Sequence, residues 1–98
     1  MYLSPEFQVL CERIDFANAE AVKREGAQLL GASASPVQVD LGGLQRANTL
    51  AVAVMVAWYR RARQQDKAMV FVNLSDELRN IVTFSGLAEV LLPEAPND

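Results

Sequence analysis

The side chains best placed to do chemistry in this sequence are Asn48 and Thr49, which precede a long apolar stretch. Residues 37–41 alternate as in a short buried strand, and residues 42–48 form a glycine-bearing loop that leads into a helix beginning near Thr49. The free N–H groups and the dipole of a helix N-terminus favour negative charge. The Thr49 hydroxyl is therefore the group at which we expect a partner or a phosphate to act.

The residues that most catalytic and metal sites need are absent. The sequence has no His and a single Cys, Cys11, which excludes Ser-His and Cys-His triads, an internal disulfide and most zinc sites. Asp15, Asp40 and Glu77 fall at expected helix starts and strand ends, where carboxylates usually serve as caps. The glycine pair at 42–43 lacks the Lys-Ser/Thr pair of a phosphate-binding loop. We expect no enzyme activity, no cofactor and no metal.

Length and composition predict one compact, soluble domain over residues 1–98, of which 51% are apolar. The formal charge is -3, and the one basic cluster, Arg60, Arg61 and Arg63, falls at a helix end where it complements the helix dipole, so we expect no nucleic acid partner. The longest apolar run, Leu50 to Tyr59, is too short for a bilayer, which needs about 20 residues. With no signal pattern at the N-terminus, these features predict a cytoplasmic location without membrane insertion.

The expected elements alternate between strands and helices, which predicts a small α/β sheet with right-handed crossovers. They are a strand at 7–14, a helix at 19–30 ended by Gly31, a strand at 37–41, a helix at 49–65, a strand at 68–74, a helix at 76–84 and a short element at 87–92. Asp15 or Asn18 is the expected cap of the first helix, and Ser75 caps the third, whose apolar side includes Phe84. Residues 1–6 are expected as a loose or edge segment and residues 93–98 as a flexible tail.

The helix at 49–65 carries apolar residues on two sides. At 100° per residue, the side assigned to the sheet carries Ala51, Met55, Trp58, Tyr59 and Ala62. The opposite side carries Leu50, Ala53, Val54, Ala57, Arg60, Arg61 and Gln64. The helix is either covered from both sides or presents a flat, alanine-rich patch to a partner. We favour the patch, because a domain of this size has little chain left to cover it.

Two interpretations of Thr49 stand side by side. With Asn48 it forms an ordinary helix start, in which either residue is the cap. At the edge of the patch, its hydroxyl would also be a contact or a phosphorylation site, because a phosphate adds about two negative charges and would reset binding.

Several short motifs resemble the STAS domain, the fold of bacterial anti-sigma factor antagonists. Val39-Asp40-Leu41 is similar to the family's apolar-Asp-Leu strand, and Asn48-Thr49 stands where the family has an Asp-Ser/Thr pair. Residues 14–22 resemble the entry to its first helix, and residues 85–87 (SGL) resemble its helix-ending signature. The resemblance covers residues 9–93 and implies a small central β-sheet with helices packed against it.

Within the family, residues 58–62 (WYRRA) and the ending LAEVLLP look most like the MlaB type, the cytoplasmic STAS subunit of the Mla phospholipid transporter. This resemblance implies a non-enzymatic subunit that binds the transporter's ABC ATPase, MlaF, at the inner membrane and supports the lipid asymmetry of the outer membrane. The implied contact residues are Asn48, Thr49, Leu50, Ala53, Ala57 and Arg60.

Two departures from the family pattern bear on regulation. Asn48 replaces the usual acid, and the bulky Leu50 replaces the usual small residue beside Thr49. Thr49 is therefore expected as a binding residue first and a phosphosite second. The alternative is an anti-sigma factor antagonist that a kinase-type anti-sigma factor phosphorylates on Thr49.

Overall fold

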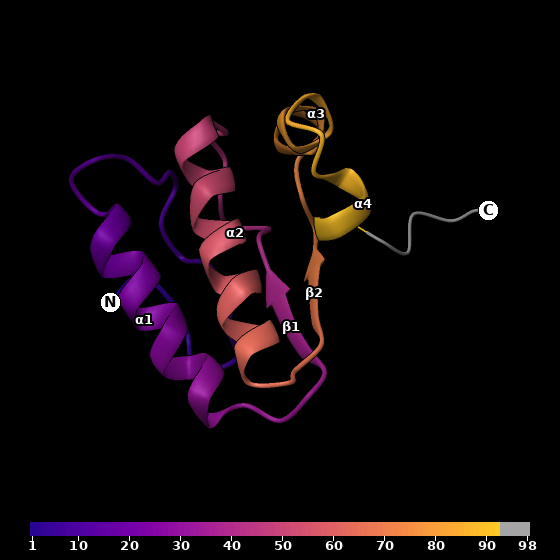
Figure 1. The fold of residues 1–98 in the computed structure, drawn as a ribbon. Helices are drawn as coiled ribbons and strands as arrows, with labels where there is room; N and C mark the ends of the chain where they lie inside the picture. The colour runs from indigo at the N-terminus through magenta and orange to yellow at the C-terminus, as the bar shows by residue number, and fades with distance from the viewer. Residues whose placement is uncertain (93–98) are drawn as a thin grey trace.

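A computed structural model describes residues 1–92 of the chain (Figure 1). The expected flexible tail at 93–98 lies outside the described residues. The elements in chain order are α1 (Ala19–Ala32), β1 (Val37–Asp40), α2 (Thr49–Gln64), β2 (Met69–Val72), α3 (Asp76–Phe84) and α4 (Ala88–Leu91). None of these helices is long and apolar enough to cross a bilayer.

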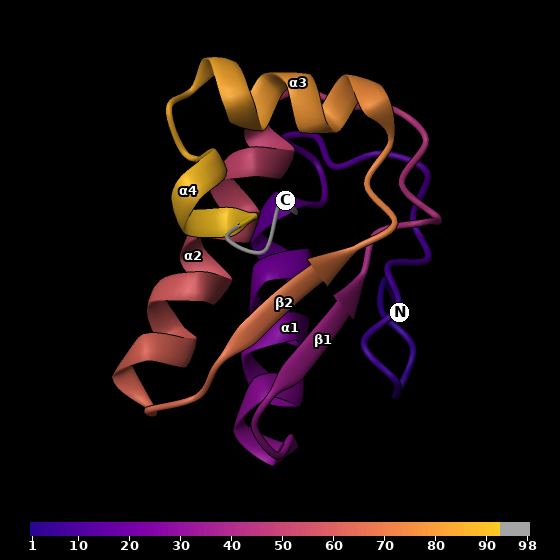
Figure 2. The same cartoon turned by 90° about the vertical axis from the view of Figure 1, so that its right-hand side faces the viewer.

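The centre of the fold is the β1–α2–β2 unit predicted from the sequence. β1 and β2 pair in parallel, with Val37 opposite Met69 and Asp40 opposite Val72. α1 and α2 lie side by side on the same side of this two-stranded sheet (Figure 1), and in Figure 2 the strands cross in front of α1, with α2 to their left. α3 crosses the end of the sheet and contacts α2. α4 also contacts α2. The chain thus forms a compact α/β structure of four helices and a small parallel sheet within residues 1–92.

Local capping chemistry sets the starts of α2 and α3. Asn48 accepts a hydrogen bond from the Ala51 backbone N–H at 2.9 Å, and Ser75 accepts one from the Leu78 N–H at 3.1 Å. Ser75 is the predicted cap of α3, and of the two residues predicted for α2, Asn48 and Thr49, Asn48 is the cap. The prediction for the end of α1 is wrong, because the helix continues through Gly31 to Ala32. The Ser33 hydroxyl there donates to the Leu29 carbonyl at 2.6 Å, which satisfies a carbonyl of the last turn.

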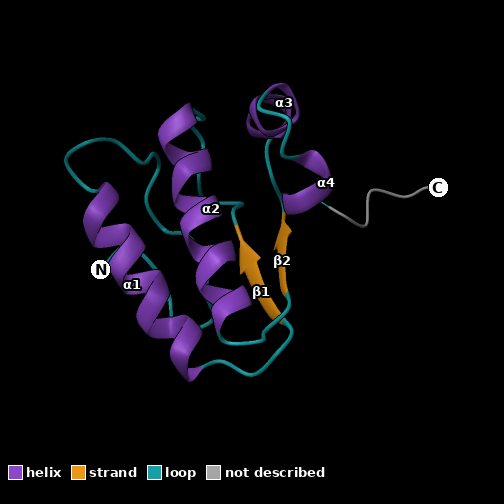
Figure 3. Cartoon of the chain, viewed as in Figure 1, coloured by secondary structure: helices purple, strands orange, loops and turns teal. Residues whose placement is uncertain are grey.

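The predicted strand at 7–14 is wrong, and Figure 3 draws residues 1–18 as loop. Pairing is limited to two single bridges, Gln8 with Asp40 in parallel and Leu3 with Val9 in antiparallel sense. Phe7 has a positive φ of 64°, which breaks the extended path, and its backbone N–H donates to the Ser4 carbonyl at 3.0 Å. Residues 1–10 therefore double back in a tight turn at the edge of β1.

One cluster of buried residues fills the space between the helices and the sheet, with Trp58 as its largest fully buried side chain. The side chains of α2 predicted to face the sheet are buried, except that Tyr59 is only half-buried. Val54, predicted on the open side of α2, is instead 1% exposed, and Ala57, Trp58 and Arg61, which follow it on the same side of α2, line a hollow shared with α1. Phe84, assigned to the apolar side of α3, is 90% exposed at the helix end.

Candidate docking surface at the start of helix α2

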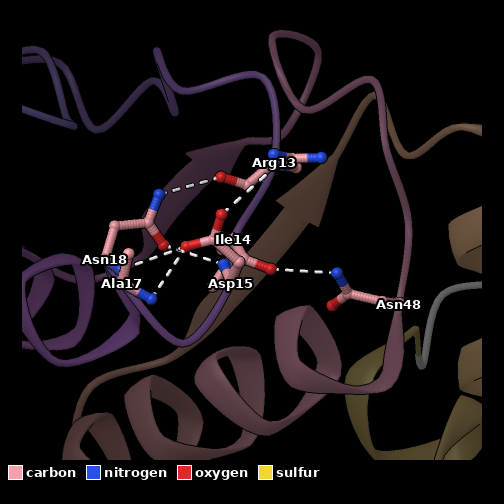
Figure 4. Close-up of polar contacts among 6 residues, drawn as sticks. All are labelled: Arg13, Ile14, Asp15, Ala17, Asn18 and Asn48. Atoms are coloured by element: carbon pink, nitrogen blue, oxygen red, sulfur yellow. Dashed lines mark hydrogen bonds and ion pairs between the residues drawn. The ribbon is translucent and has the colours of Figure 1, made fainter.

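Asn48 joins the start of α2 to the segment that precedes α1. Its side-chain oxygen caps the helix, and its side-chain amide donates to the Ile14 carbonyl at 2.9 Å (Figure 4). An aspartate has no N–H with which to make the second bond. The structure thus gives a physical reason for the amide at this position, where the sequence pattern of the family has an acid.

The turn between residues 13 and 18 is held by its own polar groups, as Figure 4 shows. The Asp15 carboxylate accepts from the backbone N–H groups of Ala17 and Asn18 at 2.9 and 3.2 Å, and it lies 3.3 Å from Arg13 Nε. Asn18 accepts from the Asp15 N–H at 2.9 Å and donates to the Arg13 carbonyl at 3.0 Å. This network fixes the backbone of the turn, at whose tip Phe16 is 94% exposed.

Phe16 and the start of α2 enclose a shallow hollow of about 380 Å³. We call this region the Thr49 surface, and its residues are Asp15, Phe16, Asn48, Thr49, Leu50 and Ala53. Thr49 and Ala53 are exposed, and Leu50 is half-buried. An exposed aromatic ring on a fixed turn, beside apolar and small side chains, is the composition of a protein-contact surface rather than of a catalytic site.

The predicted site residues divide into two groups. Asn48, Thr49, Leu50 and Ala53 lie together on the Thr49 surface. Ala57 lines a second hollow, between α1 and α2, and Arg60 is exposed but lines neither. Phe16 was not among the predicted site residues. The signal that could have found it is a large aromatic residue within the polar turn Asp15 to Asn18, where no buried face required one.

Two further titratable groups, the Asp40 carboxyl and the Cys11 thiol, have shifted pKa values. The Gly42 N–H, at 2.8 Å, and the Asn73 amide, at 3.1 Å, both donate to Asp40 and lower the pKa of its carboxyl group. Asp40 therefore fixes the start of the loop between β1 and α2. Burial raises the pKa of the Cys11 thiol, which disfavours the reactive thiolate. Among residues 1–92, no three Cys, Asp or Glu side chains form a group suited to a metal ion.

Replacing Asn48 by aspartate is expected to destabilise the protein by about 1–2 kcal/mol, because the lost amide leaves the Ile14 carbonyl facing a carboxylate oxygen. The gain at the helix dipole, about 0.3–1 kcal/mol, offsets only part of this cost. Asn48→Ala removes both bonds and should cost more. Urea denaturation of the unchanged protein, Asn48→Asp and Asn48→Ala measures their free energies of unfolding, which should fall in that order. An Asn48→Asp variant as stable as the unchanged protein would contradict the role of the amide.

Comparison with known proteins places the chain by its sequence. Residues 9–93 match a family model described as "Mlab, STAS domain", a span that includes every helix and strand of the structure. No curated protein matches the chain.

Proposed function

Because the chain belongs to the STAS domain family, in its MlaB type, we propose that it is the accessory subunit of a phospholipid-trafficking ABC transporter. STAS domains are typically non-catalytic, and we infer a non-enzymatic role for this one. It docks on an MlaF-like ATPase at the cytoplasmic side of the inner membrane and supports the assembly and activity of a transporter that maintains lipid asymmetry in the outer membrane.

The observation that carries this proposal is the Thr49 surface. Phe16 is almost fully exposed, yet its turn is held by the hydrogen bonds of Asp15 and Asn18. Little backbone freedom is therefore lost when a partner covers the ring, and such preorganised aromatic side chains contribute strongly to binding. Leu50 and Ala53 extend the apolar contact along α2, with the Thr49 hydroxyl at its edge.

Thr49→Glu is expected to weaken the affinity for the purified ATPase subunit about tenfold or more, which corresponds to about 1.4 kcal/mol. The substitution places a charge in an apolar contact, where desolvation opposes binding. At the first position of α2 the same charge interacts favourably with the helix dipole, so the fold itself is not destabilised. Isothermal titration calorimetry measures the affinity.

Thr83→Glu is the matched control, because Thr83 is an exposed threonine on α3 that does not line the Thr49 surface. Its affinity should match that of the unchanged chain. If Thr49→Glu also binds as tightly as the unchanged chain, the Thr49 surface is not the docking site.

The exposure of Thr49 also supports a second candidate, an anti-sigma factor antagonist switched by phosphorylation. Incubation with a kinase-type anti-sigma factor and ATP, followed by intact mass measurement, separates the two functions. One added phosphate that Thr49→Val abolishes would favour the switch, and an unchanged mass would count against it.

A further inference from the structure

A second hollow, of about 530 Å³, lies between α1 and α2. We call it the α1–α2 groove. Its charged lining comes from Glu20, Lys23 and Arg24 on α1 and from Arg61 on α2, while Ala57 and the edge of Trp58 add apolar surface. The Trp58 indole N–H donates to the Lys23 carbonyl at 3.2 Å, which holds the two helices in register here.

The groove is positively charged on a chain whose formal charge is -3. Three of its side chains are cations and only Glu20 is an acid. Glu20 lies 3.0 Å from Lys23 Nζ, so their charges largely cancel. Arg24 and Arg61 form no ion pair with any of residues 1–92. Two unpaired guanidinium groups that line one groove repel each other, and a carboxylate placed between them would be attracted to both.

The helix dipole does not account for this arrangement. Arg61 and Arg63 both lie in the last turn of α2, where either can complement the dipole. Arg63, however, donates to the Tyr59 hydroxyl at 3.1 Å and lies 5.9 Å from the centre of that ring. Arg61 lines the groove instead. Arg24 lies in the middle of α1, beyond the turn on which the dipole acts.

The α1–α2 groove is continuous with the Thr49 surface along α2. Ala53 lines the hollow of the Thr49 surface, and Ala57, one turn later, lines the groove. Arg61 follows after one more turn. A strip of α2 therefore passes from apolar to basic along its length, and its two alanines leave room for a partner's backbone to come close.

We propose that the α1–α2 groove receives an acidic, amphipathic helix of the partner that docks on the Thr49 surface. This inference rests on the proposed function, in which the partner is the ATPase subunit. The apolar side chains of that helix pack on Ala53 and Ala57, and its carboxylates pair with Arg24 and Arg61. The groove thereby sets the direction in which the partner helix lies, because reversing it would place its acids beside Phe16.

The test compares the affinity of two variants for the purified ATPase subunit. Arg24→Glu combined with Arg61→Glu should weaken binding about tenfold or more, because like charges then face each other across the contact. Arg63→Glu, the control, reverses one charge in the same helix turn as Arg61 but outside the groove, and it should change the affinity less than about threefold. Thermal unfolding of each variant alone confirms that the fold is intact.

Trp58 provides a readout inside the groove. It is the one tryptophan of the sequence, so a ¹⁵N-labelled chain has a single indole N–H signal. Adding unlabelled ATPase subunit should shift or broaden this signal, and about 1 M salt should reduce the effect by shortening the Debye length from about 10 Å to about 3 Å.

The outcomes separate the inference from the proposed function. If the double arginine variant and Arg63→Glu bind equally well while Thr49→Glu binds weakly, the groove inference is wrong and the docking site stands. The groove inference is also wrong if the indole signal is unmoved by a partner that binds. If the unchanged chain does not bind the ATPase subunit, the proposed function fails and the inference fails with it.

Discussion

Replacing Gly26 by alanine is expected to lower the free energy of unfolding by about 2–4 kcal/mol, although this change inside a helix normally stabilises by about 1 kcal/mol. Gly26 lies in α1 against the indole of Trp58. An added Cβ would stand 2.1 Å from Nε1 and 2.3 Å from Cε2 of that ring. These distances are far below van der Waals contact, so either the indole or the whole of α1 must move.

Neither movement is cheap. Trp58 is 1% exposed, and its ring packs edge-on against Phe7 at 5.3 Å between ring centres. Displacing the indole would break its hydrogen bond to the Lys23 carbonyl and leave a polar group unpaired, at a cost of about 1–3 kcal/mol. Displacing α1 would open the apolar interface that it forms with α2.

Two controls isolate this contact. Gly31→Ala makes the same change in the same helix, where a Cβ meets nothing within 4 Å, and it should stabilise the protein by about 0.5–1 kcal/mol. In a Trp58→Phe background, which lacks the clashing atoms, the penalty of Gly26→Ala should fall below about 1 kcal/mol. Urea denaturation measures all of these proteins. If alanine changes the free energy of unfolding equally at positions 26 and 31, the close contact between Gly26 and Trp58 does not restrict the residue at position 26.

The second large effect is expected at Gly43, in the loop between β1 and α2. Its φ is not in the left-handed region, so alanine is allowed by the backbone, but the added Cβ would stand 2.2 Å from the Val9 carbonyl oxygen. The backbone of the loop fixes the position of the Cβ, and the Val9 oxygen is itself a backbone atom, so no side-chain rotation can relieve the clash. The loop and the N-terminal segment must separate, which we expect to cost about 2–3 kcal/mol.

This separation should also reach the docking surface. The Glu12 carbonyl accepts from the backbone N–H groups of Gln45 and Arg46 at 2.8 and 3.0 Å, so the loop is bonded to the segment that leads to Phe16. Gly43→Ala should weaken these bonds, and amide hydrogen exchange at Gln45 and Arg46 should accelerate more than the global loss of stability predicts.

Gly42→Ala is the matched control, because the Cβ there approaches only the Asp40 carboxylate, at 3.0 Å, and the Asn73 Cβ, at 3.5 Å. Rotation of the Asp40 side chain relieves this contact but breaks the hydrogen bonds from Gly42 and Asn73, so we expect a loss of about 1 kcal/mol, less than for Gly43→Ala. Equal stability of the Gly42→Ala and Gly43→Ala variants would contradict the close approach to Val9.

Structural features that depend on a few neighbouring residues, such as helix caps and helix starts, were predictable from the sequence. Asn48 and Ser75 each cap a helix within their own first turn, and the two short apolar strands flank a helix long enough to connect them in parallel. The position of Thr49 at the start of α2 follows from the same local signals. The family was also recognisable at this level, because its motifs lie at such starts and ends.

Tertiary structure decided which faces are covered and which segments pair. Residues 7–14 alternate like a strand, but Phe7 turns back into the core and the segment then bonds to the loop after β1, so the ladder stops at single bridges. Val54 is buried on the side of α2 that packs beside α1, and Phe16 is exposed on a turn that a side-chain network fixes. Helix capping depends on residues that are neighbours along the chain, so it can be predicted from the sequence. Burial depends on neighbours in space, which only the packed chain brings together.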